Sequence, residues 1–424
     1  MTDAVALDDL AGGALLDEVA RLHAVREQSS VSILLAAASW ADQCGEGSFD
    51  LDLVNRGGER FVRLGGAGTP RVAEFAPAVF GARLQLSPYA GARLIADVLD
   101  LRHRLPILWG RVQRLEVREG HARFVARKTR DLSIEQAAYV DERVAESADG
   151  RLSWARFETL VEAAIVAADP DAAQAREEAA ATEQFAKPTR SDEHGMRGFY
   201  VRADFATIAR LDATVAYLAE ALAAMGDTST LDERRVKAVL ILANPTQAVE
   251  LLKAYAESRS AAPIDESKLL PAIWLFVHTS GSGVARVEGM SPVTDEWVRT
   301  HLGERCRFKI TEAIDPMGQT PVDAYEIPDR HRQAVHLMTP ADTFPFASST
   351  SRRMQLDHTK EYRPGAPGQS RIGNYGPMIT FHHRIKTHSG WHVEQPYPGI
   401  YVWRDPYGAL YLVDHTGTRA LRAA

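Results

Sequence analysis

The sequence predicts an α-rich protein of several domains, in which helical and α+β parts precede a small C-terminal module of two strands and a helix. Helical apolar periodicity runs through most of the first 190 residues, short β-like runs begin after residue 271, and the tail beyond residue 345 is basic and rich in histidine. The 424 residues are 45% hydrophobic and 25% charged, which suits two or three globular domains. We expect a helical domain over residues 1–190, an α+β region over 195–340 and the module over 341–424.

The N-terminal region is expected to be mostly helical because its apolar residues recur every three to four positions. Serine is a common N-cap, and Ser133 and Ser153 stand directly before two of these periodic runs. The Ala- and Glu-rich stretch 169–195 shows little apolar periodicity and predicts an exposed helix that runs into a linker. The other expected helices cover residues 14–43 and 88–103 and short pieces between 104 and 132, divided by Pro106 and Gly120.

The middle region mixes helices and strands. Residues 196–205 alternate like a strand, and helices are expected over 207–225 and over 232–256, with a break at Pro245. Four later runs predict short strands: AIWLFVHTS, GVARVEG, RFKITEAID and VDAYEIP, which begin at residues 272, 283, 307 and 322. Two further helices are expected, over 293–303 and 329–338.

Composition excludes several classes of protein. Cys44 and Cys306 are the only cysteines, so the sequence offers neither a disulfide framework nor a cysteine-rich structural zinc site. The first residues carry acids where an export signal needs Lys or Arg. The longest apolar run, residues 31–41, is far shorter than the roughly 20 residues that cross a bilayer. We therefore expect a cytoplasmic protein with no membrane partner.

Charge is distributed unevenly along the chain. Residues 345–424 carry eight Arg and two Lys against three Asp and two Glu, whereas the whole chain has a net charge of −7. A basic tail suits a polyanion, and an unevenly charged solvated surface explains it equally well. Residues 101–130 hold nine Arg and Lys against two Glu. They form either a DNA-contacting helix pair or, in the interpretation that we favour, polar helix faces paired with the acids of 131–147.

One stretch of the tail, residues 352–391, combines acid, amide and imidazole groups. Asp357 and His358 are adjacent in a run that can form a strand, so their side chains point to opposite faces. A carboxylate can hold a divalent cation, and an imidazole, which titrates near neutrality, can take a proton from water. One side chain can therefore bind a metal while the other faces the water.

The rest of this stretch completes a small module. A Pro/Gly-rich loop turns the chain back to Asn374, whose side chain can hold a loop or an imidazole by hydrogen bonds. A helix is expected to begin at Pro377, with His382 on its apolar face and His383 aimed at the metal. Strand, loop, strand and helix with these groups converging predict a ββα-metal module.

These intervals are those of a known motif. Asp-His, an asparagine sixteen residues after the histidine and a histidine nine residues after the asparagine resemble the His-Asn-His (HNH) nuclease motif. The flanking segments GNYGPM and FHHRIKTHSGW, and upstream LLAAASWAD and DERRVKAVLILANP, are similar to a large actinobacterial family of HNH endonucleases with an N-terminal helical domain of unknown function. The resemblance implies an enzyme that hydrolyses DNA phosphodiester bonds with a divalent metal.

Motif position assigns a role to each residue. By resemblance, His358 would be the general base that takes a proton from water, and Asn374 would orient it or help to ligate the ion. Asp357 and His383 would be metal ligands, and His382 would be structural. This oxygen-rich set favours Mg²⁺ or Mn²⁺ over Zn²⁺.

The chain departs from the family pattern in two places. Some relatives carry another histidine one helical turn after the metal ligand, where this chain has Thr387; His388 is a further candidate metal ligand if the helix ends early. The cysteine pairs of many HNH proteins are absent, so the module needs a packed core, for which we expect Trp391, Tyr401, Trp403, Tyr407 and Tyr411.

Two kinds of partner follow from these expectations. DNA would meet basic side chains around the motif, which position the backbone without reading its sequence. The candidates for these phosphate contacts are Arg352, Arg353, Arg384 and Lys386. The N-terminal helices could join two copies of the chain or bind another protein. The alternative function is a catalytically inactive HNH-fold protein that serves in DNA binding or assembly.

Overall fold

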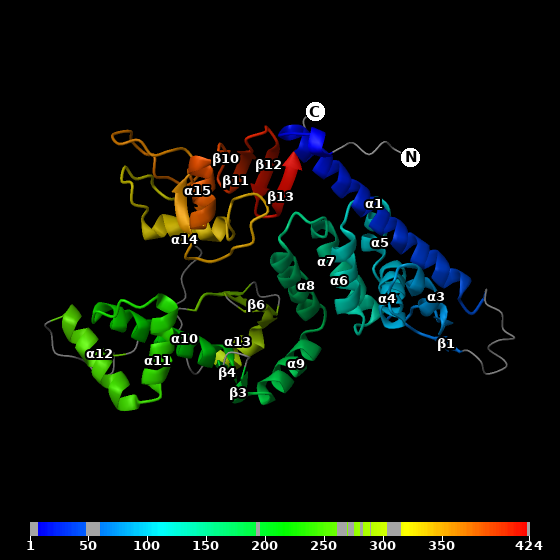
Figure 1. Cartoon of the computed structure of the whole chain (residues 1–424), viewed down its shortest axis with the longest axis horizontal. Coiled ribbons are helices and arrows are strands. Elements are labelled where there is room, and N and C mark those ends of the chain that lie inside the picture. Colours follow the sequence, from blue (N-terminus) through cyan, green and yellow to red (C-terminus); the bar gives the residue numbers. More distant parts are fainter. Residues whose placement is uncertain are drawn as a thin grey trace. The chain divides into compact units, whose positions relative to one another are not determined.

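The computed structural model describes residues 7–47, 60–191, 196–260, 269, 275–279, 283–288, 290–302 and 315–421 (Figure 1). The chain forms two compact units, one of Met1–Ala168 with Ile310–Ala424 and the other of Asp169–Lys309. Helices predominate and the sheets are small and antiparallel, as expected for the α-rich multidomain class. The domain limits expected near residues 190 and 340 stay a prediction.

The first unit opens with helices that start at recognisable caps. Ser87 and Ser133 accept hydrogen bonds from backbone amides at the starts of two helices, and Ser133 forms a capping box with Gln136. Pro88 and Pro106 are the first residues of α4 and α5, where proline costs no helical hydrogen bond. The helices are α1 (Gly13–Gln43), α3 (Ala76–Arg83), α4 (Pro88–Arg104), α5 (Pro106–Gln113), α6 (Glu119–Thr129), α7 (Ile134–Val144) and α8 (Trp154–Ala168).

Helix α4 lies at the centre of the helical core. It packs against α1, α3, α5 and α6, and its Ile95, Val98, Leu99 and Leu101 are buried. Each such side chain stabilises the fold by about 1.5–3 kcal/mol relative to an exposed position. A short ladder of β1 (Phe61–Val62) with β2 (Val72–Ala73) and the 3-10 turns η1 (Leu7–Asp9) and η2 (Ala145–Ser147) accompany the helices.

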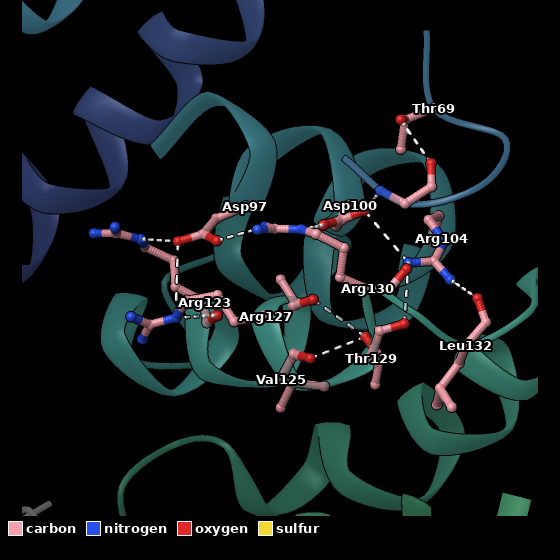
Figure 2. Close-up of polar contacts among 12 residues, drawn as sticks. Thr69, Asp97, Asp100, Arg104, Arg123, Val125, Arg127, Thr129, Arg130 and Leu132 are labelled. Atoms are coloured by element: carbon pink, nitrogen blue, oxygen red, sulfur yellow. Dashed lines mark hydrogen bonds and ion pairs between the residues drawn. The ribbon is translucent and has the colours of Figure 1, made fainter. Parts of the chain in front are cut away.

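Buried ion pairs tie α4 to α6 (Figure 2). Asp97 and Asp100 are fully buried on α4. Asp97 contacts Arg123 at 2.9 Å and Arg130 at 2.8 Å, and Asp100 contacts Arg130 at 2.7 Å. Asp97 and Asp100 precede the basic stretch, and Glu119, which also pairs with Arg123 at 2.6 Å, lies within it, so the expectation of partners in 131–147 is wrong for these two arginines. These ion pairs form because α4 packs against α6, and the order of residues along the chain does not reveal that contact.

Arg104 is a fully buried cation in the same network (Figure 2). Its guanidinium donates to a carboxylate oxygen of Asp100 and to four carbonyls at and beyond the end of α6. The four carbonyls belong to Thr129, Arg130, Leu132 and Ser133. Carbonyls at a helix end lack helical partners, and this one side chain satisfies the last carbonyl of α6 and three carbonyls of the segment that leads to α7.

The second unit contains a helical part and a small sheet. Its helices and strands are α9 (Pro170–Thr182), β3 (Phe185–Ser191), β4 (Arg197–Arg202), α10 (Phe205–Ala224), α11 (Leu231–Leu242), α12 (Pro245–Arg259), β5 (Val277–Thr279), β6 (Val284–Val287), β7 (Val293–Thr294) and α13 (Asp295–Leu302). β3 pairs with β4, and β5, β6 and β7 form an antiparallel sheet in that order. Leu218, Ala238 and Leu252 form the core of the helical part, and Ala285, Val287 and Leu302 that of the sheet.

Most elements expected in the middle of the chain are present, with two corrections. The linker expected at the end of 169–195 is wrong, because Phe185–Ser191 forms β3 and pairs with β4. The strand in 196–205 and the helix break at Pro245 are confirmed by β4 and by the start of α12. The run RFKITEAID lies outside the described residues except for Asp315. The strand expected at 322–328 is wrong, since the segment makes only an isolated bridge from Val322 to Ser370.

The C-terminal part of the first unit is a helix, a hairpin with its helix, and a four-stranded meander. Its elements are α14 (Asp329–Met338), β8 (Gln355–His358), β9 (Tyr375–Met378), α15 (Thr380–His388), β10 (His392–Tyr397), β11 (Ile400–Arg404), β12 (Leu410–Asp414) and β13 (Gly417–Leu421). The strands β10 to β13 pair in sequence order. The helix expected from Pro377 begins three residues later, because Pro377 is paired within β9 opposite Leu356.

An aromatic core supports this part of the unit. Trp403 and Tyr401 are fully buried, and Trp391 and Tyr411 pack against them from half-buried positions, as expected from the sequence. Tyr407 is 62% exposed, so its assignment to the core is wrong. It follows Asp405 and Pro406 in the β11–β12 turn, where its amide donates to Asp405 at 2.8 Å.

Hydrogen bonds between described residues join the helical part of the first unit to this sheet. The amide of Thr418 donates to the carbonyl of Arg151 at 2.8 Å, and Arg156 donates to the carbonyl of His415 at 3.0 Å. Gly417 has a φ of +115°, and a Cβ on it would lie 2.3 Å from the carbonyl oxygen of Arg151. Only glycine therefore allows the β12–β13 turn to approach so closely.

Candidate functional site

The candidate site lies on the β8–β9 hairpin and on α15. Asp357 and His358 stand opposite Gly376 and Tyr375 in the antiparallel pair. Adjacent strand residues point to opposite faces. The contacts agree with this alternation: Asp357 meets side chains of α15, whereas His358 meets Ser370 of the connecting loop.

Asp357 and His383 converge, as the sequence predicts. Oδ1 of Asp357 lies 3.3 Å from Nε2 of His383. On its other side the imidazole places Nδ1 3.2 Å from Oε1 of Gln355. Both neighbours are acceptors: a proton on Nδ1 donates to Gln355, and a proton on Nε2 donates to the carboxylate of Asp357, so Nε2 has a lone pair for a cation when the single proton of the neutral ring is on Nδ1. Gln355, two residues before Asp357 on the same strand face, is a positioning residue that the sequence interpretation missed.

The donor set at Asp357 and His383 fits a hard divalent cation. A carboxylate oxygen and an imidazole nitrogen lie close enough to share one cation, and with Nδ1 protonated the contact to Gln355 orients the imidazole, as is usual for metal-ligating histidines. Side chains of both residues are partly exposed, so water can complete the coordination. In the part of the chain that the structure describes, no group of three or more His, Cys, Asp and Glu side chains is placed to hold a metal ion.

Lys386 forms an ion pair with the other oxygen of the Asp357 carboxylate. Its Nζ lies 2.5 Å from Oδ2 of Asp357 and also donates to the backbone carbonyl of His358. Lys386 and Asp357 side chains are only 17% and 15% exposed. Lys386 was expected to contact phosphate, and in this structure it contacts the candidate metal ligand.

His358 lies on the opposite face of β8 in an aromatic surrounding. It is 6% exposed, and the rings of Tyr325, Tyr362 and Tyr375 lie with their centroids 5.2–5.8 Å from the imidazole. Burial lowers the pKa of His358, and the Lys386 charge lowers it further, whereas Asp357 raises it. The imidazole is therefore neutral at neutral pH, the state that a general base requires.

Ser370 fixes the tautomer of His358. Its hydroxyl lies 2.9 Å from Nε2 of the imidazole and donates to the carbonyl of Ala324 at 2.5 Å. A hydroxyl has one hydrogen, so with that hydrogen on Ala324 it accepts from His358. Nε2 then carries the imidazole proton, and Nδ1 is the atom with a free lone pair. Ser370 is a second residue that the sequence interpretation missed, because it lies in the loop, 12 positions after His358.

Asn374 binds the loop between the two strands. Its Oδ1 accepts from the amide of Lys360 at 2.7 Å, and its Nδ2 donates to the carbonyls of Lys360 and Gln369. These contacts match the loop-holding role suggested by its residue type. The polar contact to the His358 ring comes from Ser370, so Asn374 orients this imidazole through the backbone of the loop.

His382 is anchored to a buried carboxylate. Its Nδ1 lies 2.8 Å from Oδ2 of Asp342, which is fully buried and also accepts from the amide of Ile379 ahead of α15. The ring stacks on Phe344, with centroids 4.5 Å apart. These contacts give His382 the structural surroundings that its motif position implied. Asp342 lies 40 positions earlier, and no local pattern in the sequence identifies it.

The remaining candidates lie around the hairpin and helix. His388 is the last residue of α15 and is exposed. Arg384 is exposed on the same helix, and Arg352 and Arg353 precede β8, half-buried and exposed respectively. The structure thus brings Asp357, His383 and Lys386 together and leaves these arginines at the rim.

Comparison with known proteins gives one match. Residues 57–263 match the family model described as a domain of unknown function, DUF222. These residues span β1 to α12 and stop before the hairpin that carries the site. Neither a curated protein nor a solved structure matches the chain. Within the described ranges, no helix is long and apolar enough to cross a bilayer.

Proposed function

We propose that this protein is an endonuclease of the HNH type that hydrolyses DNA phosphodiester bonds with a divalent metal. The observation that carries the proposal is the pairing of Asp357 with His383, 3.3 Å apart on a ββα element, with a neutral His358 on the adjacent strand position. The DUF222 match supports it in a second way, because such domains are often associated with HNH proteins.

The residues divide the reaction between them. His358 takes a proton from water at Nδ1, while Ser370 accepts the hydrogen bond from its Nε2–H and steadies the ring as it becomes charged. Asp357 and His383 would hold Mg²⁺ or Mn²⁺, with Gln355 orienting His383. When bound, such a cation neutralises charge on the phosphate and on the departing oxygen. Asn374 keeps the loop that carries Ser370 in place.

Basic side chains around the hairpin would position the DNA. Arg353 and Arg384 are exposed near the site, and Arg352 stands beside Arg353. Contacts of this kind go to phosphate oxygens and carry no sequence information. We therefore expect their substitution to weaken binding at all DNA sequences alike and to reduce its salt dependence.

Cleavage of supercoiled plasmid tests the proposal. The full chain is incubated with plasmid in Mg²⁺ or Mn²⁺, and the wild type is compared with His358→Ala and with His392→Ala, which changes an exposed histidine of β10. Loss of a general base lowers the rate by about 10²–10⁴-fold, whereas the control should cut like the wild type. Cutting by His358→Ala at the wild-type rate would show that His358 is not the general base. If neither the wild type nor the control cuts the plasmid, the proposed activity is refuted.

A second candidate function is an inactive HNH-fold protein that binds DNA or assembles with partners. It is favoured by the ammonium of Lys386 at Asp357 and by the small exposure of His358. Filter binding with and without divalent ion separates the two candidates. Tight DNA binding that needs no divalent ion, together with uncut plasmid, would support the inactive protein.

A further inference from the structure

Lys386 is placed as part of the site and not as a surface lysine. Its ammonium contacts Oδ2 of Asp357 and the carbonyl of His358, so it spans both motif residues of β8. Its side chain is 17% exposed, although lysine ammonium groups usually remain in water. The contact therefore orders a long flexible side chain over the hairpin.

One helix face supplies both groups that hold Asp357. His383 and Lys386 are three residues apart on α15 and lie on the same side of the helix. Oδ1 of Asp357 faces the imidazole and Oδ2 faces the ammonium. One oxygen of the carboxylate thus contacts a side chain that can ligate a metal, and the other contacts a positively charged ammonium.

A divalent cation at this carboxylate would conflict with that arrangement. An ion held by Asp357 and His383 would lie beside the ammonium, and like charges at such distances repel strongly where water is partly excluded. The ion also competes for the carboxylate that balances the lysine. The lysine stem has four carbons and can swing to another position, whereas the imidazole is fixed by Gln355.

We propose that Lys386 is the resident cation of the site: it holds Asp357 in place when no divalent ion is bound, and the ion displaces it. The inference rests on the proposed function, since it takes Asp357 and His383 as the ion's ligands. The exchange keeps the carboxylate positioned for the ion without leaving a buried charge unpaired. The released ammonium then becomes available to a phosphate oxygen of DNA.

Calorimetric titration of the full chain with Mn²⁺ alone tests the exchange. Lys386→Gln should bind Mn²⁺ about tenfold more tightly than the wild type or better, because the competing charge is gone. Lys360→Gln is the matched control: it removes the same charge from an exposed lysine two residues after His358, and it should change affinity by less than about twofold. Equal or weaker binding by Lys386→Gln, or an equal gain by Lys360→Gln, would overturn the inference.

Amine labelling of the wild type gives a second measurement that needs no variant to fold. Lysines are acetylated with a limiting reagent in buffer with and without Mg²⁺, and the modified peptides are quantified by mass spectrometry. Labelling of Lys386 should rise several-fold with Mg²⁺, whereas labelling of Lys360 should stay constant. Unchanged labelling of Lys386 at saturating ion would contradict displacement.

Failure of the inference and failure of the proposed function give different results. If Lys386→Gln binds the ion more tightly but the wild type does not cleave plasmid, the displacement of Lys386 is supported and the nuclease activity is refuted. If the wild type cleaves plasmid with a divalent metal but Lys386→Gln binds Mn²⁺ no more tightly than the wild type, the nuclease activity is supported and the displacement of Lys386 is refuted. No ion binding by the wild type or by Lys386→Gln would remove the exchange.

Discussion

Gly66 and Arg104 fit together so closely that a Cβ on the glycine would lie 2.2 Å from Nη1 of the guanidinium. The same Cβ would lie 2.3 Å from the backbone oxygen of Arg130. The amide of Gly66 donates to Asp100 at 2.7 Å, so the loop cannot withdraw without losing this hydrogen bond. The glycine is therefore required by space and not by an unusual backbone conformation.

Gly66→Ala is expected to destabilise the chain. The methyl group has no room beside a buried cation and a backbone carbonyl, and overpacking of this kind costs about 1–3 kcal/mol. Gly120→Ala is the control, since a Cβ at Gly120 of α6 meets no atom within 4 Å. Urea unfolding measures the free energy of unfolding of both variants. Equal values for Gly66→Ala and Gly120→Ala would show that the loop at Gly66 moves to accommodate a methyl group at little cost.

Arg104→Met is expected to lower the free energy of unfolding by roughly 3–5 kcal/mol, because it leaves buried carbonyls and part of the Asp100 charge without partners. Arg102→Met on the same helix is the matched variant. Arg102 pairs with Asp42 at the surface, where an ion pair contributes about 0–1 kcal/mol. Urea unfolding near neutral pH compares them, and similar losses would mean that the buried network contributes little beyond a surface pair.

The elements that the sequence predicts well are those with local signals. Ser133 with its capping box, Pro88 and Pro106 mark helix starts within a few residues of chain, so pattern alone finds them. Pro377 shows the limit of this reasoning. It looks like a helix start, but pairing with Leu356 on β8 places it in a strand and moves the helix start to Thr380.

The candidate site divides in the same way. The intervals of Asp357 and His383 in the motif predict their approach, because a hairpin and a helix fix where both point. Asp342 and Ser370 could not be found, since each reaches its histidine across a loop and has no spacing rule of its own. Gln355 could have been predicted from the sequence, because residues two apart on a strand share a face and Gln355 therefore lies on the same face as Asp357.

His121 predicts a pH dependence of stability. It is buried against Trp154 and Phe157, and burial, with a smaller effect from Arg118, lowers its pKa from 6.5 to about 4. The unfolded chain therefore binds a proton that the folded chain does not. The contribution of His121 to the free energy of unfolding should be constant above pH 6.5 and should fall as the pH drops from 6.5 toward 4, whereas Asp141, whose pKa burial raises to about 6, acts in the opposite direction.

The variant His121→Phe isolates this contribution, because phenylalanine suits the aromatic surroundings and does not titrate. As the pH drops from 6.5 to 4, the free energy of unfolding of the wild type should fall relative to that of the variant, and the difference between the two proteins should be constant above that range. Other histidines with lowered pKa, such as His358 and His331, add the same slope to both proteins. Identical pH profiles for wild type and variant would refute the assignment.

Ser370→Ala is expected to slow plasmid cleavage and to change its pH profile. The hydroxyl accepts the Nε2–H of His358, and an acceptor stabilises the charged imidazolium more than the neutral ring. Its removal should lower the pKa of His358 further, so the acid limb of the pH–rate profile moves to lower pH while the rate falls about 10- to 100-fold. Ser389→Ala also removes a hydroxyl that donates to a backbone carbonyl, at the exposed end of α15, and should keep the wild-type profile. A slower Ser370→Ala enzyme with an unmoved acid limb would assign Ser370 to the fold of the loop rather than to the imidazole, because loss of loop structure lowers the rate without changing which group titrates.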